Sequence, residues 1–166
     1  MKKIHIYILT LILSISGISI SHLAAADLNS RCDEKKKELS ESLESYIKET
    51  AKLWSFIGQN MEFAQDDAVG EAMKERVAHQ EKIDSKINEL KQNDKFHFQP
   101  GEGFKKELTD LVSESKEAQS KEANLEDFIQ ELKVRDEPEK ESFNRLMEKF
   151  ALIEECTKEA SEEPQV

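Results

Sequence analysis

The residues with the most evident chemistry are two cysteines, Cys32 and Cys156, which flank the helix-patterned part of the chain. They lie too far apart for a redox Cys-X-X-Cys motif. In an exported protein, two cysteines predict an intramolecular disulfide, with intermolecular pairing or two free thiols as the alternatives. Closing so long a loop would stabilise the fold by about 2–4 kcal/mol.

The next candidates are the two histidines outside the N-terminal leader, His79 and His97. Glu75 and His79 lie four residues apart, so on a helix they share one face and could both bind a metal ion. Two ligands alone make a weak site, and the chain lacks the Glu-X-X-His motifs of di-iron bundles. We therefore predict no metal site and no cofactor.

Patterns typical of other catalytic classes are also missing. The serines lie in polar stretches without an adjacent base, so nucleophilic catalysis is not indicated. The sequence contains no Gly-rich phosphate-binding loop. We expect a protein that is not an enzyme.

The first 26 residues have the composition of a secretory signal peptide. Lys2 and Lys3 precede an apolar run, and the small residues Ala24–Ala26 supply a cleavage pattern. A transmembrane anchor is the alternative, but polar interruptions of the run and the cleavage pattern favour a signal. We expect export to the periplasm or the extracellular space, and the Lys-Lys start is more typical of bacteria.

The chain is acidic, with a formal net charge of −11. Without Lys2 and Lys3 the charge of residues 27–166 becomes −13, since the leader holds no other charged side chain. Such a field repels nucleic acids and anionic membranes, which argues against both as partners. It favours solubility and a basic partner.

The elements that must position these residues are helices, because apolar residues recur at intervals of three and four. Leu, Ile, Val and Phe are scarce, which suits a bundle with a narrow apolar seam rather than a compact sheet protein. The predicted helices run from about Leu28 to Met61, from about Asp67 to Gln92, from Phe104 to Leu132, and from Pro138 to about residue 160.

Two of these boundaries have particular signals. The third helix has a weak middle, and Asn124 with Asp127 could instead start a separate helix there. Pro138 suits the first turn of the fourth helix, with Asp136 as its cap and Glu139 as the partner of that cap. The second helix is expected to bury Val69, Met73 (or Ala72), Val77, Gln80, Ile83, Ile87 and Leu90.

Four helices joined by short connections predict an all-α, antiparallel, up-down-up-down four-helix bundle of elongated shape. An even number of antiparallel helices places Cys32 and Cys156 at the same end, where a terminal disulfide can join them. Residues 27–160 would form one helical domain, and residues 161–166 a disordered acidic tail. Regular seams of this kind also leave a monomer and a coiled-coil dimer open.

Aromatic side chains are the candidate binding residues. Phe56 and Phe63 do not fit the stripe of the first helix, and a loop with a strong Pro-Gly turn signal carries Phe96, His97 and Phe98. Each group either packs inward or docks a partner. We expect a non-enzymatic exported protein that binds another macromolecule, as an effector, inhibitor, chaperone or adaptor. The alternative is a carrier of a lipid or other small apolar ligand, since such bundles resemble exchangeable lipid-binding proteins in outline.

Overall fold

The computed structural model describes residues 32–63, 65–92, 96–117 and 124–162, and the regular secondary structure in these ranges is entirely helical. The elements are α2 (Asp33–Gln59), the 3-10 helix η2 (Met61–Phe63), α3 (Asp67–Gln92), α4 (Phe104–Glu117) and α5 (Leu125–Glu162). The predicted all-α class is confirmed. The predicted signal peptide lies outside the described residues.

Helix α2 buries the stripe that its periodicity predicts. The buried residues are Leu39, Leu43, Tyr46, Ile47, Thr50, Ala51, Leu53, Trp54, Ser55 and Ile57. The helix ends at Gln59, and the side-chain amide of Asn60, the next residue, donates to the Phe56 carbonyl at 2.8 Å. Asp66 then caps α3, since its Oδ1 accepts from the Ala68 backbone at 2.9 Å.

The predicted single helix from Phe104 to Leu132 is wrong. Helix α4 ends at Glu117, and α5 begins at Leu125 behind a cap formed by Asn124. Asn124 Oδ1 accepts from the Asp127 backbone at 2.9 Å, and its amide donates to the Asp127 carboxylate at 2.7 Å. These bonds satisfy donors that a helix start otherwise leaves unpaired, so the alternative boundary at Asn124 is confirmed.

The predicted break before Pro138 is also wrong, because α5 continues through this proline. Pro138 removes one backbone hydrogen bond, to the carbonyl of Val134. Both residues are exposed, with Val134 at 66%, so water can solvate that carbonyl. Asp136 and Glu139 are therefore not a helix cap and its partner. The helix also includes Ser161 and Glu162, two residues that the prediction assigned to the tail.

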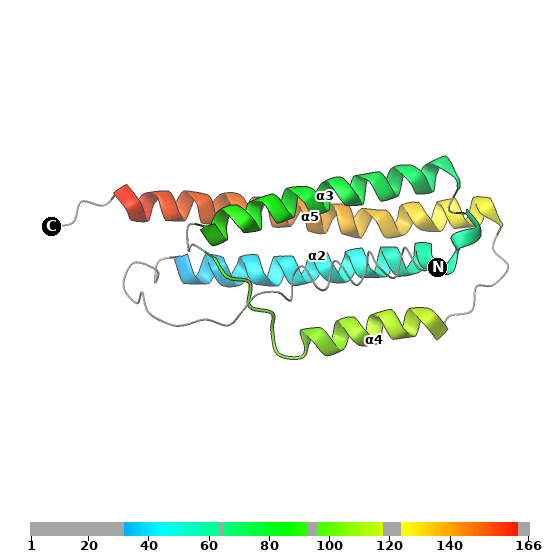
Figure 1. The fold of residues 1–166 in the computed structure, drawn as a ribbon, viewed down its shortest axis with the longest axis horizontal. Coiled ribbons are helices and arrows are strands. Elements are labelled where there is room, and N and C mark those ends of the chain that lie inside the picture. Colours follow the sequence, from blue (N-terminus) through cyan, green and yellow to red (C-terminus); the bar gives the residue numbers. More distant parts are fainter. Residues whose placement is uncertain (1–31, 64, 93–95, 118–123, 163–166) are drawn as a thin grey trace.

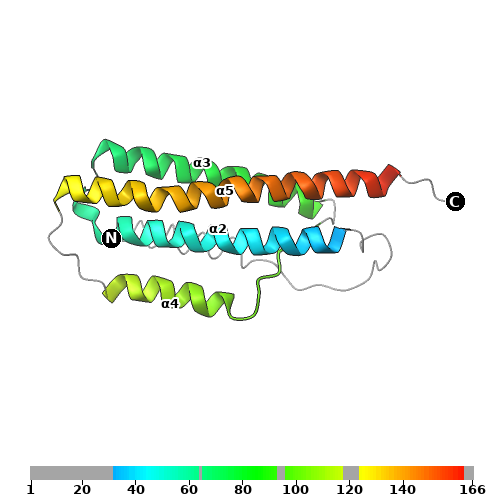
Figure 2. The ribbon, with the colours of Figure 1, turned by 180° about the vertical axis from the view of Figure 1, so that it is seen from behind.

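The helices lie side by side in the order α3, α5, α2, α4, as Figures 1 and 2 show. Helices α2 and α5 run in opposite directions, since Glu38 pairs with Lys149 whereas Phe56 stacks on Phe128. Helices α3 and α5 run in the same direction. Their residue numbers rise together along the contacts Arg76–Asp136, His79–Glu139 and Lys86–Glu154.

Helix α4 packs on α2 and runs parallel to it, since residue numbers rise together along the contacts Glu44–Gly101 and Lys48–Glu107. The turn before α4 is fixed by the Glu44 carboxylate, which accepts a hydrogen bond from the Gly101 backbone. Gly103 has a φ of 89°, a conformation that favours glycine, and it precedes the first residue of α4. Lys48 on α2 pairs with Glu107 and lies 5.5 Å from the centre of the Phe104 ring.

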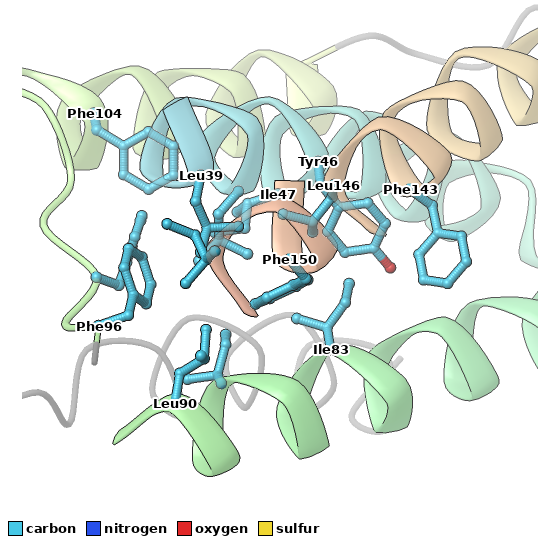
Figure 3. Close-up of a cluster of buried hydrophobic side chains, with 14 of the residues drawn as sticks. Leu39, Tyr46, Ile47, Ile83, Leu90, Phe96, Phe104, Phe143, Leu146 and Phe150 are labelled. Atoms are coloured by element: carbon cyan, nitrogen blue, oxygen red, sulfur yellow. The ribbon is translucent and has the colours of Figure 1, made fainter. Parts of the chain in front are cut away.

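The apolar interior consists of two clusters. The larger one draws side chains from α2, α3, α4, α5 and the loop before α4, and Figure 3 shows Phe150 of α5 among those of α2 and α3. The smaller one lies at the other end of α2 and contains Leu53, Ile57, Val69, Ala72, Phe128 and Leu132. None of the described helices has the length and apolar content needed to cross a membrane.

Candidate functional site

The predicted disulfide between Cys32 and Cys156 is present, with a Cα–Cα distance of 6.1 Å. Both residues are buried, at 2% and 8% exposure. The bond joins the start of α2 to the last part of α5 across a sequence separation of 124 residues. It therefore prevents these two helices from separating at this end of the molecule.

The loop before α4 does not present its aromatic side chains to solvent. Phe96 and Phe98 are buried at 2% and 4% exposure and belong to the larger apolar cluster. Phe98 meets Phe104 edge to face, with the ring centres 6.3 Å apart. Burial of aromatic rings stabilises the fold, so these two residues are core residues rather than a docking surface. Of the three candidate binding residues in this loop, only His97 is exposed.

Phe56 and Phe63 are placed differently, because both are partly exposed. They flank the buried ring of Phe128 on α5: Phe56 stacks on it at 5.1 Å and Phe63 lies at 5.0 Å with a tilt of 33°. The guanidinium of Arg135 lies 4.7 Å from the centre of the Phe56 ring and pairs with Glu131 at 2.7 Å. We call Phe56, Phe63, Phe128 and Arg135 the aromatic platform.

The aromatic platform lies where the end of α2, η2 and the start of α5 meet (Figure 1). Leu125 stands one turn before Phe128 on α5 and is 41% exposed. Stacked rings are rigid and lose little conformational entropy on binding, and arginine adds a cation–π contact. This end of the molecule thus combines side chains that commonly anchor protein interfaces.

A second unusual feature is a charged cluster inside the molecule, which we call the Arg76 cluster. Its centre is Arg76 of α3, whose side chain is 1% exposed. The guanidinium contacts Asp136, lies 2.8 Å from Glu139 and lies 3.0 Å from Glu75. Glu139 is 0% exposed, so the cluster places a charge pair fully inside the protein.

Two further basic groups complete the Arg76 cluster. Lys140 lies 2.6 Å from Asp136 and 3.3 Å from Glu75, and the contact with Asp136 raises the pKa of Lys140. His79 lies 3.1 Å from Glu139, and its ring stacks on Phe143 at 3.6 Å. Each carboxylate of the cluster therefore contacts at least two of its basic residues, as a buried charge requires.

Tyr46 of α2 borders this cluster. Burial raises the pKa of the Tyr46 hydroxyl above its usual range, and the negative charge of Glu139 adds to the effect. Among the described residues, the buried polar atoms without an aligned hydrogen-bond partner are the hydroxyls of Tyr46 and Thr50, Nε and Nη2 of Arg76, and Oε2 of Glu139. The contacts of the last three are therefore ion-pair contacts. Three helices thus contribute polar side chains to one region of the interior.

Glu75 and His79, the pair considered for a metal ion, belong to the Arg76 cluster. Their side chains lie 4.0 Å apart, and the His79 side chain is only 14% exposed. The Glu75 carboxylate is engaged by Arg76 and Lys140. No group of three or more potential ligands that could hold a metal ion occurs among the described residues.

Arg76 and Glu139 are the residues that the sequence analysis missed. The predicted stripe of α3 included Val77, which is 43% exposed, whereas the neighbouring Arg76 is buried. The sequence did contain a signal. In a continuous α5, Leu132, Asp136, Glu139 and Phe143 follow one another at intervals of four, three and four, which places both carboxylates on the core face.

Comparison with known proteins provides no relative for this chain: no family model, no curated protein and no solved structure matches it significantly.

Proposed function

We propose that this chain is an exported, non-enzymatic helical protein that binds another macromolecule through the aromatic platform. The observation that carries the proposal is the partial exposure of Phe56 and Phe63, whose rings both contact the buried Phe128 ring. Binding energy at interfaces concentrates in a few aromatic and arginine side chains with neighbours that exclude water. Leu125 extends the apolar surface beside them.

The proposed fold is an elongated up-down-up-down bundle, in which each helix reverses the direction of the one before it. It is supported by the antiparallel contacts of α2 with α5 and by the parallel contacts of α3 with α5. Two rigid attachments, the disulfide and the Arg76 cluster, join three of the helices. A rigid support of this kind holds a binding surface in one conformation before the partner arrives, which lowers the entropic cost of binding.

Export is supported by the signal-like residues 1–26 and by the disulfide. Disulfides persist in oxidising compartments such as the periplasm and the extracellular space. We infer the absence of catalysis because the most reactive side chains make structural contacts. Both cysteines are oxidised, and His79 is packed between Glu139 and the Phe143 ring.

A carrier of an apolar ligand is the second candidate, and the position of α4 favours it. Helix α4 packs on α2, whereas α2, α3 and α5 are connected by the disulfide and the Arg76 cluster. A displaced α4 would uncover Phe104 and Leu108, which belong to the larger apolar cluster. Native mass spectrometry of the purified protein tests this candidate: a bound lipid of defined mass supports it, and a bare polypeptide contradicts it.

Photocrosslinking tests the proposed function directly. A photoreactive phenylalanine analogue replaces Phe63 in the full chain, which is produced in its natural host. The control carries the same analogue in place of Glu155, an exposed residue near the disulfide. We expect a discrete crosslinked product from position 63 and none from position 155. No product at position 63, or equal products at both positions, would contradict the proposal.

A further inference from the structure

The surroundings of the aromatic platform carry more negative than positive charge. Residues 59–73 contain four acidic side chains and residues 124–132 contain three, and neither segment contains Lys, Arg or His. Both segments meet at the platform, because Phe63 of one contacts Phe128 of the other at 5.0 Å. Two of these carboxylates have an ion-pair partner, Glu71 with Lys74 and Glu131 with Arg135, and the others leave the local charge negative.

Some of these carboxylates are available to a partner. Glu62 and Glu126 are exposed, and within the described part of the chain their side chains take part in no hydrogen bond or ion pair. Elsewhere on the surface, exposed acids commonly have a basic neighbour, as in the contacts Lys37–Glu41 and Lys48–Glu107. The positive charge of Arg135 on the platform is already paired with Glu131.

The platform thus has an apolar aromatic centre and an acidic rim. A complementary surface places an apolar side chain against the rings and positive side chains against Glu62 and Glu126. An amphipathic helix with Lys or Arg beside its apolar stripe has this arrangement, and such helices bind proteins through their apolar face. Anionic lipid and nucleic acid have the wrong charge.

We infer that the aromatic platform binds a cationic amphipathic helix of a partner protein, with an apolar side chain on the exposed parts of the Phe56 and Phe63 rings and basic side chains on Glu62 and Glu126. This inference rests on the proposed function and names the class of partner. The partner at this surface is a basic protein segment and not a second copy of this acidic chain.

The probe is a fluorescein-labelled synthetic 18-residue amphipathic helix of Leu and Lys, and the comparison peptide has Glu in place of each Lys. Binding to the full chain is measured by fluorescence anisotropy at two salt concentrations. We expect saturable binding of the Lys peptide that weakens as salt rises, and no binding of the Glu peptide.

Matched variants locate the binding surface. The double change Glu62→Gln with Glu126→Gln should weaken binding of the Lys peptide by roughly 2–10-fold, as expected for two rim ion pairs. The control, Glu34→Gln with Glu155→Gln, removes the same charge from exposed positions near the disulfide and should leave affinity unchanged. Phe63→Ala should weaken binding by about tenfold or more, whereas Val134→Ala, on an exposed residue outside the platform, should not.

Each contrary result has a defined meaning. Equal weakening by both double variants would mean adsorption to the general negative charge, which overturns the inference. Weakening by Phe63→Ala alone would mean an apolar partner without basic side chains, which also overturns it. Sedimentation of the free protein as a dimer that Phe63→Ala converts to a monomer would assign the platform to a second copy. If the Lys peptide does not bind but position 63 still gives a discrete crosslink, the inference of a cationic partner is overturned. The proposed function, binding of a macromolecule at the platform, then still stands.

Discussion

Arg76 of α3 and Glu139 of α5 form an ion pair in the interior, with 2.8 Å between Nε and Oε2 and with side-chain exposures of 1% and 0%. Removing two charges from water costs several kcal/mol for each, and their mutual attraction offsets this cost only with good geometry and additional partners. Asp136, Glu75 and His79 are these partners. Because the pair joins parallel helices, we interpret it as the contact that sets the register of α3 on α5.

Breaking one side of this pair should be more damaging than replacing both sides. Arg76→Met leaves Glu139 charged and buried, so we expect the free energy of unfolding to fall by about 3–5 kcal/mol. The double change Arg76→Met with Glu139→Leu should recover most of that loss, because both buried charges are removed. Urea unfolding followed by circular dichroism measures both values. A double variant that is no more stable than Arg76→Met would contradict the interpretation.

The Asn124 cap gives a second prediction. Asn124→Ala removes the acceptor for the Asp127 backbone and should lower the free energy of unfolding by about 1 kcal/mol. Asn124→Asp retains an acceptor and serves as the control. If residues 104–132 formed one helix, alanine at this position would be neutral or stabilising in the same denaturation experiment.

These boundaries show how much of the fold the sequence predicts. The core stripe of α2, the start of α3 and the turn before α4 each follow from local periodicity or capping residues. Pro138 was misread because a proline at the first turn of a helix and one in the interior have the same sequence neighbourhood. What decides between them is tertiary: Asp136 and Glu139 meet Arg76 on the core face, while Pro138 faces solvent.

The candidate binding residues could be predicted only in part, because their burial also depends on tertiary contacts. Phe56 lies off the α2 stripe, and in the structure it is partly exposed whereas the residues of the stripe are buried. Phe96 and Phe98 alternate with His97 in a loop, and such a pattern does not reveal which face of the loop meets the protein. The burial of these two rings depends on the position of α4, which the Glu44–Gly101 hydrogen bond fixes from a distant part of the chain.

Alkaline pH gives a third prediction. The pKa of Tyr46 is raised by burial and by Glu139, so the hydroxyl stays protonated in the fold while the unfolded chain ionises near pH 10. A raised folded-state pKa means that stability is fully present below about pH 10 and is lost as the pH rises above it. Lys86 and Lys140 contribute with the same sign, since their pKa values are also raised.

Tyr46→Phe isolates the tyrosine contribution. This variant should be close to the parent in stability at pH 7, because the Tyr46 hydroxyl has no aligned partner among the described residues. Above pH 10 it should lose less stability than the parent. Urea midpoints at pH 7 and at pH 10–11 measure the difference, and parallel losses in the two proteins would contradict the assignment.

The disulfide gives a fourth prediction. Replacing Cys32 and Cys156 together with serine should lower the free energy of unfolding by about 2–4 kcal/mol, because the unfolded chain regains the freedom of a long loop. Non-reducing electrophoresis should show that the parent protein migrates as a compact monomer and more slowly after reduction. An unchanged unfolding midpoint in the serine variant would mean that the bond contributes no stability.

The central claim is that the aromatic platform is the surface that binds a macromolecule. Hydrogen exchange, measured by mass spectrometry on the chain alone and on the complex recovered by crosslinking, tests it most directly. We predict slower exchange on binding in residues 56–63 and 124–135, with no change in residues 33–45 near the disulfide. Protection confined to α4 or to the region near the disulfide, with these two segments unchanged, would contradict the claim.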